Sequence, residues 1–319
     1  MSNKHATVGL GVGANRRANV RAALEHVRDD LVAAVRDVVM LKPNFLSASN
    51  PLVCTHADAI RGALDVLSEL PHRPKEILIA EGGNEAYSGE AFRFFGYLDL
   101  PEEYDIPIRL VDLNTETRWH GTRVYMIDGS HRVVKMPKTV LECPCVISMA
   151  VAKTHDGAMV TLALKNLIMG TLRKKDRIKI HGFLHHSERR HPSEARALSR
   201  NLIRVARHLY PHFSVIDGTV GIQGNGPGGT DTVALKLAAA SADTVAVDAV
   251  IAKLMGFEPL DVGTIFYGDA IGLGVGDIER INVLGGDLET LALPFKPHDS
   301  IDLQRQWRIP GVWEMAATE

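Results

Sequence analysis

Short apolar runs alternate with longer amphipathic stretches along most of the chain. The apolar runs have the length and flanking turn residues of strands, and they lie at 7–12, 37–42, 76–80, 146–151, 213–216, 234–240 and 278–283. Amphipathic stretches typical of helices lie between them, at 15–31, 59–70, 159–172, 196–209 and 242–255. This alternation predicts an α/β protein with a largely parallel, Rossmann-like sheet flanked by helices.

One region, at about 85–135, departs from the alternation. Residues 108–113 and 124–127 resemble strands, and Gly129-Ser130 predicts a hairpin turn, so we expect a small β excursion there. With 319 residues and 45% hydrophobic content, the chain can bury a full core, and we interpret 1–319 as a single α/β domain. A basic, His-rich loop is expected at about 173–195.

Composition narrows the classes of function. The net charge of -2 argues against nucleic-acid or membrane-surface binding driven by bulk charge. No apolar run is long enough to span a membrane. The three cysteines are few and odd in number, which does not suit a disulfide framework and favours a reducing compartment. We therefore expect a cytoplasmic protein. A homo-oligomer is compatible with this composition.

The stretch 146–172 carries the strongest site signal. Its strand-like start breaks at 153–157, the polar sequence KTHDG, and then resumes in a helical pattern. In α/β folds such a turn lies at the carboxyl edge of the sheet, where ligands bind. Lys153 and His155 are therefore candidate site residues.

The helical pattern that follows adds three polar residues. Thr161 and Lys165 are four residues apart, so on a helix they would share a face, and Asn166 comes next. A lysine among apolar neighbours needs water, a carboxylate or an anionic ligand. Lys165 could reach solvent along its aliphatic stem, but the nearby Lys153 and His155 favour a ligand.

Other strand ends bring further polar groups to the same edge. Lys42 closes a strand before Pro43, with Asn44 beyond it, and Glu81 follows the strand at 76–80. Glu81 could also cap the next helix. Asp217 ends the strand at 213–216.

The segment around Thr55 and His56 precedes a helix. Thr55 either caps that helix or lines a site. His56 either lies next to the cap without a further role or lines the same site.

A loop after Asp217 is unusually rich in glycine. It contains Gly224, Asn225, Gly226 and Gly228, and such a loop presents backbone N–H groups that can close over an anion. The alternative is a long turn without a ligand.

The signals for metal or dinucleotide binding are weaker. GLGVG at 9–13 lacks the spacing of a dinucleotide fingerprint, and the pair Cys143 and Cys145 has no second pair in register. His181 lies in the basic loop, and we expect it to turn inward. His155 and His181 are therefore the candidate metal ligands.

Several motifs together resemble a known family. They are KPN at 42–44, CTHADAIRGAL at 54–64, EGG at 81–83, AKTHDGAMVTLALKNLIMG at 152–170, DGTVGIQGNGPGG at 217–229 and SADTVAVDAVIAKLMG at 241–256. The chain is similar in these blocks to the family known as domain of unknown function 362. The resemblance implies a fold and a site rather than a reaction. Some members carry an added ferredoxin-like segment with four-cysteine motifs, which this chain lacks. The early strand and helix layout is also similar to that of enzymes that racemise small hydroxy acids.

These observations support one hypothesis about function. A crevice at the carboxyl edge of the sheet would collect Lys42, Thr55, His56, Glu81, Lys153, His155, Lys165, Asp217 and the loop 224–229. We expect an enzyme that acts on a small anionic metabolite bearing phosphate or carboxylate. Lys42 and Lys165 would hold the anion, and Lys153 or His155 would act as general acid or base. Glu81 or Asp217 would orient them or hold a divalent cation.

Two alternatives remain open at this point. The first is a metal- or iron–sulfur-linked redox protein, with His155, His181, Glu81 and Asp217 as metal ligands. The second is a non-catalytic protein that binds the same kind of ligand.

Overall fold

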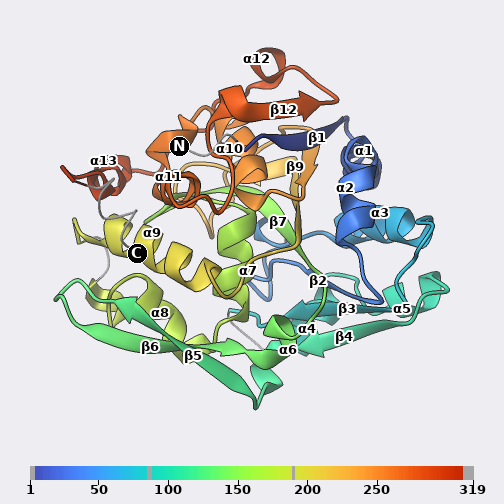
Figure 1. The fold of residues 1–319 in the computed structure, drawn as a ribbon, viewed down its shortest axis with the longest axis horizontal. Helices are drawn as coiled ribbons and strands as arrows, with labels where there is room; N and C mark the ends of the chain where they lie inside the picture. The colour runs from blue at the N-terminus through green and yellow to red at the C-terminus, as the bar shows by residue number, and fades with distance from the viewer. Residues whose placement is uncertain (1–3, 85–87, 189–190, 312–319) are drawn as a thin grey trace.

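The structure is a computed structural model that describes residues 4–84, 88–188 and 191–311. A ten-stranded sheet crosses the molecule (Figure 1). Its main path runs through β12 (Ile281–Leu284), β1 (Ala6–Val12), β11 (Leu237–Ser241), β9 (Phe213–Ile222), β7 (Val146–His155), β2 (Val38–Lys42), β3 (Glu76–Glu81) and β4 (Ile108–Asp112).

Most neighbouring strands on this path are parallel. The exception is β11, which runs antiparallel to both β1 and β9. Two short strands extend the edges of longer ones, because β8 (Met159–Thr161) pairs with β7 and β10 (Thr232–Val233) pairs with β9. The predicted α/β class with a largely parallel sheet is therefore confirmed.

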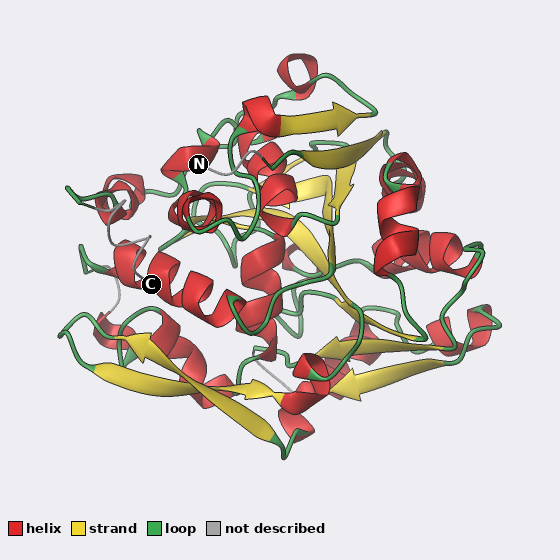
Figure 2. Ribbon diagram, in the orientation of Figure 1, coloured by secondary structure: helices red, strands yellow, loops and turns green. Residues whose placement is uncertain are grey.

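Helices cover both faces of the sheet (Figures 1 and 2). One face packs against α1 (Arg16–His26), α2 (Arg28–Ala34) and α3 (Ala57–Ser68), and the other against α7 (Ala163–Thr171), α9 (Glu194–Ala206), α10 (Thr244–Leu254) and α11 (Gly263–Ala270). The remaining short helices are α4 (Ser88–Phe94), α5 (Leu100–Glu103), α6 (Lys138–Leu141), α8 (Arg177–Ile180), α12 (Leu288–Leu291) and α13 (Ile301–Gln304).

The alternation of side chains along a strand explains this layering. In β2, Val39 and Leu41 join the core cluster formed with α3, while Met40 between them joins the cluster formed with α7 and α9. All three side chains are fully buried. The strand is apolar without interruption because both faces of the sheet are covered.

The predicted excursion is smaller than the range 85–135 suggested. Strand β4 joins the main sheet beside β3, and only β5 (Trp119–Tyr125) and β6 (His131–Pro137) form a separate two-stranded hairpin. The hairpin packs against α8 and α9. Asn201 of α9 fastens it, since its side chain bonds both the N–H and the carbonyl of Tyr125.

The central stretch differs from the sequence prediction in one respect. Strand β7 continues through Lys153 to His155, where a polar turn was expected, and β8 returns alongside it with Thr161 opposite Lys153. Pairing with β8 satisfies the backbone groups of this extension. Helix α7 begins only at Ala163, so the prediction that Thr161 and Lys165 share a helix face is wrong.

The start of α7 is held by a carboxylate from another helix. Asp248 of α10 accepts hydrogen bonds from the backbone nitrogens of Ala163, at 2.8 Å, and Leu164, at 3.2 Å. These N–H groups have no partner within the helix, and the carboxyl oxygens of Asp248 supply one. Asp248 therefore fixes the helix that carries Lys165 and Asn166.

We expect Asp248→Asn to change how stability depends on pH. Burial raises the pKa of Asp248 to about 7, whereas an unfolded aspartate titrates near ~3.9. The native state thus retains a proton that the unfolded state releases. The bound proton therefore stabilises the native state, and its contribution to the free energy of unfolding is fully present below about pH 4. The contribution falls as the pH rises toward about 7, by at most roughly 1.4 kcal/mol per pH unit.

Urea unfolding of both proteins across this range checks the expectation. The difference in the free energy of unfolding should move in favour of the variant as the pH rises. A difference that is constant with pH would contradict the assignment.

Candidate functional site

The strand order reverses between β2 and β7. The chain leaves β2 toward β3 and β4 on one side and returns as β7 on the other. In open α/β sheets, ligands bind beyond the carboxyl ends of the strands at such a point. A cavity of about 170 Å³ lies there. We call it the central cavity, and its polar lining residues are Asn44, Glu81, Asn84, Lys153, His155, Thr161, Lys165, Asn166, Arg177, His181 and His186.

A buried ion pair lies beneath the central cavity. Lys42 at the end of β2 is 0% exposed, and its ammonium forms an ion pair with Glu81 at the end of β3. It also donates to the Asn166 side-chain oxygen at 3.3 Å. Burial lowers the pKa of Lys42 and raises that of Glu81, while their mutual attraction opposes both shifts. Lys42 thus supports the cavity and does not line it.

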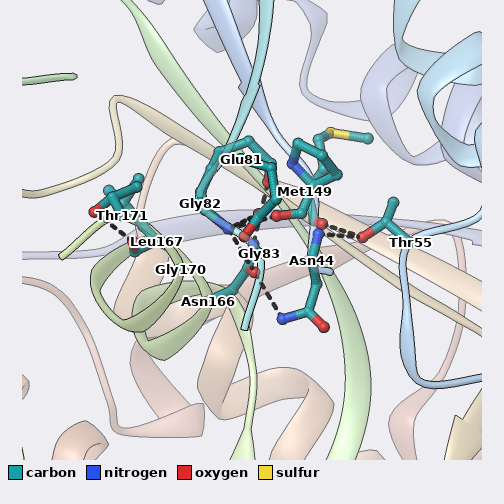
Figure 3. Close-up of polar contacts among 12 residues, drawn as sticks. Asn44, Thr55, Glu81, Gly82, Gly83, Met149, Asn166, Leu167, Gly170 and Thr171 are labelled. Atoms are coloured by element: carbon teal, nitrogen blue, oxygen red, sulfur yellow. Dashed lines mark hydrogen bonds and ion pairs between the residues drawn. The ribbon is translucent and has the colours of Figure 1, made fainter. Parts of the chain in front are cut away.

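The close approach of α7 depends on a glycine. A Cβ added to Gly170 would lie 2.2 Å from the Lys42 Nζ, which leaves no room for any other residue while the ion pair is in place. Figure 3 shows Gly170 on its helix beside Glu81, Gly82 and Gly83.

Two asparagines link the ion pair to Lys153. The Asn166 Oδ1 accepts from the Asn44 Nδ2 at 3.0 Å, and the Asn44 Oδ1 accepts from the Lys153 Nζ at 2.8 Å. Lys153 also donates to the carbonyl of Val53 at 2.7 Å. The pKa of Lys153 is lowered to about 8, mainly because the side chain is buried; the positive charge of Lys42 adds to this effect, and Cys54 and Glu81 oppose it.

Thr55 lies beside Asn44 and positions it (Figure 3). Its hydroxyl accepts from the backbone nitrogen of Asn44 at 2.8 Å and donates to the carbonyl of Met149 at 2.7 Å. Thr55 is therefore a support of the site and not the cap of the following helix. The cap of α3 is His56, whose Nδ1 accepts from the backbone nitrogen of Asp58 at 3.1 Å.

On the other wall, Lys165 meets His155. The Lys165 Nζ lies 2.9 Å from the His155 Nε2, and the His155 Nδ1 accepts from the backbone nitrogen of Gly157 at 2.9 Å. The same Nδ1 is 3.1 Å from a carboxylate oxygen of Asp156. Lys165 is 8% exposed, so its side chain does not extend into solvent.

His181 turns inward, as expected, and lines the central cavity. Its ring stacks on that of His155 with the centroids 6.1 Å apart. Its Nδ1 lies 2.8 Å from a carboxylate oxygen of Glu194 at the start of α9.

Thr161 presents a hydroxyl to the central cavity. The side chain is 6% exposed, and among the described residues its Oγ1 has no hydrogen-bond partner. An unsatisfied buried hydroxyl costs about 1–3 kcal/mol, so this group is suited to binding a polar atom of a ligand.

Arg177 is a cavity residue that the sequence did not single out. Its guanidinium is buried and donates to the carbonyls of Leu172, Gly82, Gly83 and Gly170. In the described parts of the chain no carboxylate bonds to it directly. It comes from a segment with many other cations, and no spacing in the sequence distinguishes it.

Asp217 and His56 are further predicted residues that lie outside the central cavity. Asp217 forms an ion pair with Arg16, 2.5 Å away, and His56 is half exposed at the start of α3. Neither is among the lining residues. Strand β9 runs past Asp217 to Ile222, so this carboxylate lies within the sheet and not at the end of a strand.

The glycine-rich loop reaches the cavity through Pro227 alone of its residues. The carbonyl of Gly224 accepts from the Thr154 hydroxyl at 2.9 Å, and a Cβ at Gly226 would lie 2.4 Å from the Thr154 carbonyl oxygen. Asn225 and Gly228 line a separate, open hollow, where Asn225 bonds to Asp299. The loop therefore packs against β7 and does not close over the central cavity, contrary to the expectation for an anion-binding loop.

The proposed metal ligands do not assemble. Across residues 4–84, 88–188 and 191–311, no three His, Cys, Asp or Glu side chains are placed to share a metal ion. Glu81 is paired with Lys42 and Asp217 with Arg16. For the metal-binding alternative, His155 and His181 therefore have no third ligand among these residues.

Together, the fold and the site define an open α/β protein with a cationic cavity at the carboxyl edge of its sheet. The model of the family "Domain of unknown function (DUF362)" matches residues 39–253, and the chain belongs to this family. It is also 26% identical over 247 residues to the thylakoid-associated protein sll1697 of Synechocystis sp., which covers 74% of this chain and 68% of that protein.

A solved structure also matches part of this chain. The lactate racemase apoprotein from Thermoanaerobacterium thermosaccharolyticum matches with a TM-score of 0.49 and 16% identity, over 75% of this chain and 54% of that one. No helix in the described part of the present chain is long and apolar enough to cross a membrane.

We expect Lys42→Met to be strongly destabilising. Removing one partner of a buried ion pair leaves the other charge uncompensated, which costs roughly 3–5 kcal/mol. Chemical denaturation measures the effect, and the double variant Lys42→Met, Glu81→Gln should lose less than the sum of the two single variants. Lys75→Met is the matched control, because Lys75 forms an exposed ion pair with Asp37 and its loss should change little. Additive effects of the two single changes would show that the pair is not coupled.

Proposed function

We propose that this protein is an enzyme that binds a small phosphate- or carboxylate-bearing metabolite in the central cavity and moves a proton on it. The observation that supports this most strongly is the charge of the cavity wall. Lys153, Lys165 and Arg177 line it, and Glu81, the one carboxylate among the lining residues that the structure describes, is already paired with Lys42. Such a wall attracts and holds an anion.

The size of the central cavity limits the ligand. Its volume of about 170 Å³ is below the range of roughly 300–1,000 Å³ that is typical of pockets for drug-sized ligands. Apolar side chains of Phe45, Leu46, Met169 and Ile178 complete the lining. The expected ligand is therefore a short anionic metabolite with a small apolar part.

The residues take different roles in this proposal. Arg177 and Lys165 hold the anion, because both are buried cations on the cavity wall. Lys153 moves the proton, since a pKa of about 8 populates both of its protonation states near neutral pH. His155 exchanges a proton with Lys165 through their 2.9 Å contact. Lys42, with Glu81, acts from beneath by fixing Asn166.

A non-catalytic binding protein would use the same cations. The lowered pKa of Lys153 favours an enzyme, because a lysine that only holds an anion gains nothing from a lowered pKa. No step of the proposal runs through a metal ion.

The binding part of the proposal predicts a ligand-induced rise in melting temperature. Wild-type protein should be stabilised by at least one of phosphate, malonate, lactate and pyruvate. Lys165→Met and Arg177→Met should each abolish the rise, and Lys75→Met, at a lysine whose side chain is 74% exposed, should preserve it. Unchanged shifts in both cavity variants would overturn the proposal.

The catalytic part predicts exchange of a carbon-bound proton. In D₂O, the wild-type protein should catalyse loss of a C–H signal next to the carbonyl or carboxylate of a bound compound, followed by ¹H NMR. The rate should rise with pH and level off above about 8, because the neutral Lys153 amine is the base. Lys153→Met should lower the rate by roughly 10²–10⁴-fold. A rate that does not change in this variant would contradict the role of Lys153.

A further inference from the structure

The two hydrogen-bond acceptors around Lys153 match the donors of a neutral amine. Its Nζ donates to the Asn44 Oδ1 at 2.8 Å and to the Val53 carbonyl at 2.7 Å. These are its hydrogen-bond partners within the described residues. An ammonium has three N–H donors and no lone pair, whereas a neutral amine has two donors and one lone pair. The surroundings therefore satisfy both N–H donors of the neutral form.

Both acceptors are fixed in that role. Val53 contributes a backbone carbonyl, which can only accept. Asn44 cannot turn its amide around, because its Nδ2 donates to the Asn166 Oδ1, and this oxygen also accepts from the Lys42 ammonium. A reversed Asn44 would place two oxygens against each other and its NH₂ group against Lys153.

The electrostatic environment supports the same protonation state. Lys153 is 1% exposed and has no carboxylate among its hydrogen-bond partners, so burial is the main cause of its lowered pKa; the Lys42 ammonium adds to it, and Cys54 and Glu81 oppose it. A lysine that is desolvated and lies near another cation is the usual form of an activated amine nucleophile.

A second unused polar group lies across from this amine. Thr161 on β8 is the direct cross-strand partner of Lys153 on β7, so the two side chains leave the same face of the strand pair. Both line the central cavity, and the Thr161 hydroxyl lacks a hydrogen-bond partner among the described residues. A ligand atom bound to Lys153 would lie close to this hydroxyl.

We propose that Lys153 is a nucleophile that forms a Schiff base with a small carboxylate-bearing aldehyde or ketone, such as a 2-oxo acid. This inference rests on the proposed function, because Arg177 and Lys165 hold the carboxylate. It adds the carbonyl group to the description of the substrate, and with such a substrate the neutral Lys153 amine acts as nucleophile and not as base.

The chemistry balances without any further reactant. The lone pair of the Lys153 Nζ attacks the carbonyl carbon, and the π electrons of the C=O bond move to the oxygen. That oxygen gains a proton and Nζ loses one, which gives a neutral carbinolamine. The hydroxyl then leaves with another proton as water while Nζ loses its second proton, and a C=N bond forms. The Lys165 and His155 pair, 2.9 Å apart, exchanges these protons, and Thr161 bonds the hydroxyl.

Reductive trapping on the full-length protein tests the proposal. Wild-type protein is incubated with glyoxylate or pyruvate and sodium cyanoborohydride, and the adduct is located by peptide mass spectrometry. We expect one reduced adduct per chain, at Lys153. Labelling should accelerate as the pH approaches about 8, where ordinary lysines, with a pKa near ~10.4, are still protonated. Malonate, which has no ketone or aldehyde, should slow the labelling by occupying the cavity.

The outcomes separate this inference from the proposed function. Lys153→Arg keeps a cation but removes the nucleophile, and it should eliminate the specific adduct. The malonate competition on wild-type protein gives the same information if that variant does not fold. If pyruvate or glyoxylate raises the melting temperature but the adduct falls on Lys165, on exposed lysines such as Lys75 or nowhere, Lys153 is not the nucleophile and the anion site stands. If neither compound stabilises the protein and none is trapped, both proposals fall.

Discussion

The fully buried ammonium of Lys42 is the constraint on which the rest of the site depends. An unpaired charge at that depth would cost several kcal/mol, so the fold must supply partners. Glu81 comes from β3 and Asn166 from α7, and the helix can approach only because Gly170 has no side chain. One cation thus ties two strands and a helix together at the carboxyl edge of the sheet. Breaking this pair would disturb the central cavity as well as the core.

The same contacts pass from the ion pair to the cavity wall. The Asn166 oxygen accepts from both Lys42 and Asn44, and Asn44 in turn accepts from Lys153. Each amide is oriented by its neighbour, so the position of Lys153 is set by a chain of contacts that begins at the buried ion pair. A polar group without a hydrogen-bond partner is costly in a low-dielectric interior. In this network, the Thr55 hydroxyl satisfies the backbone nitrogen of Asn44, and Lys153 at the other end lines the cavity. Support of this kind is what a precise catalytic geometry requires.

The sequence predicted the sheet and a large part of this site, for a physical reason. Polar residues that end long apolar strands meet at one edge of a parallel sheet, and this rule placed Lys153 and, through the helix that follows, Lys165. It failed for Asp217, because β9 continues past this residue. The three-residue β8 was too short to show a strand period, so Thr161 was assigned to a helix. Arg177 was one cation among many, and only its burial distinguishes it.

The central claim is that buried cations at this edge form an anion site. The most direct measurement is a crystal structure of the protein soaked with pyruvate or malonate. The account predicts density for the anion inside the central cavity, with carboxylate oxygens within hydrogen-bond distance of Lys165 and Arg177 and its other end facing Lys153 and Thr161. An anion bound only elsewhere on the molecule, with water alone beside Lys165 and Arg177 at saturating concentration, would contradict it.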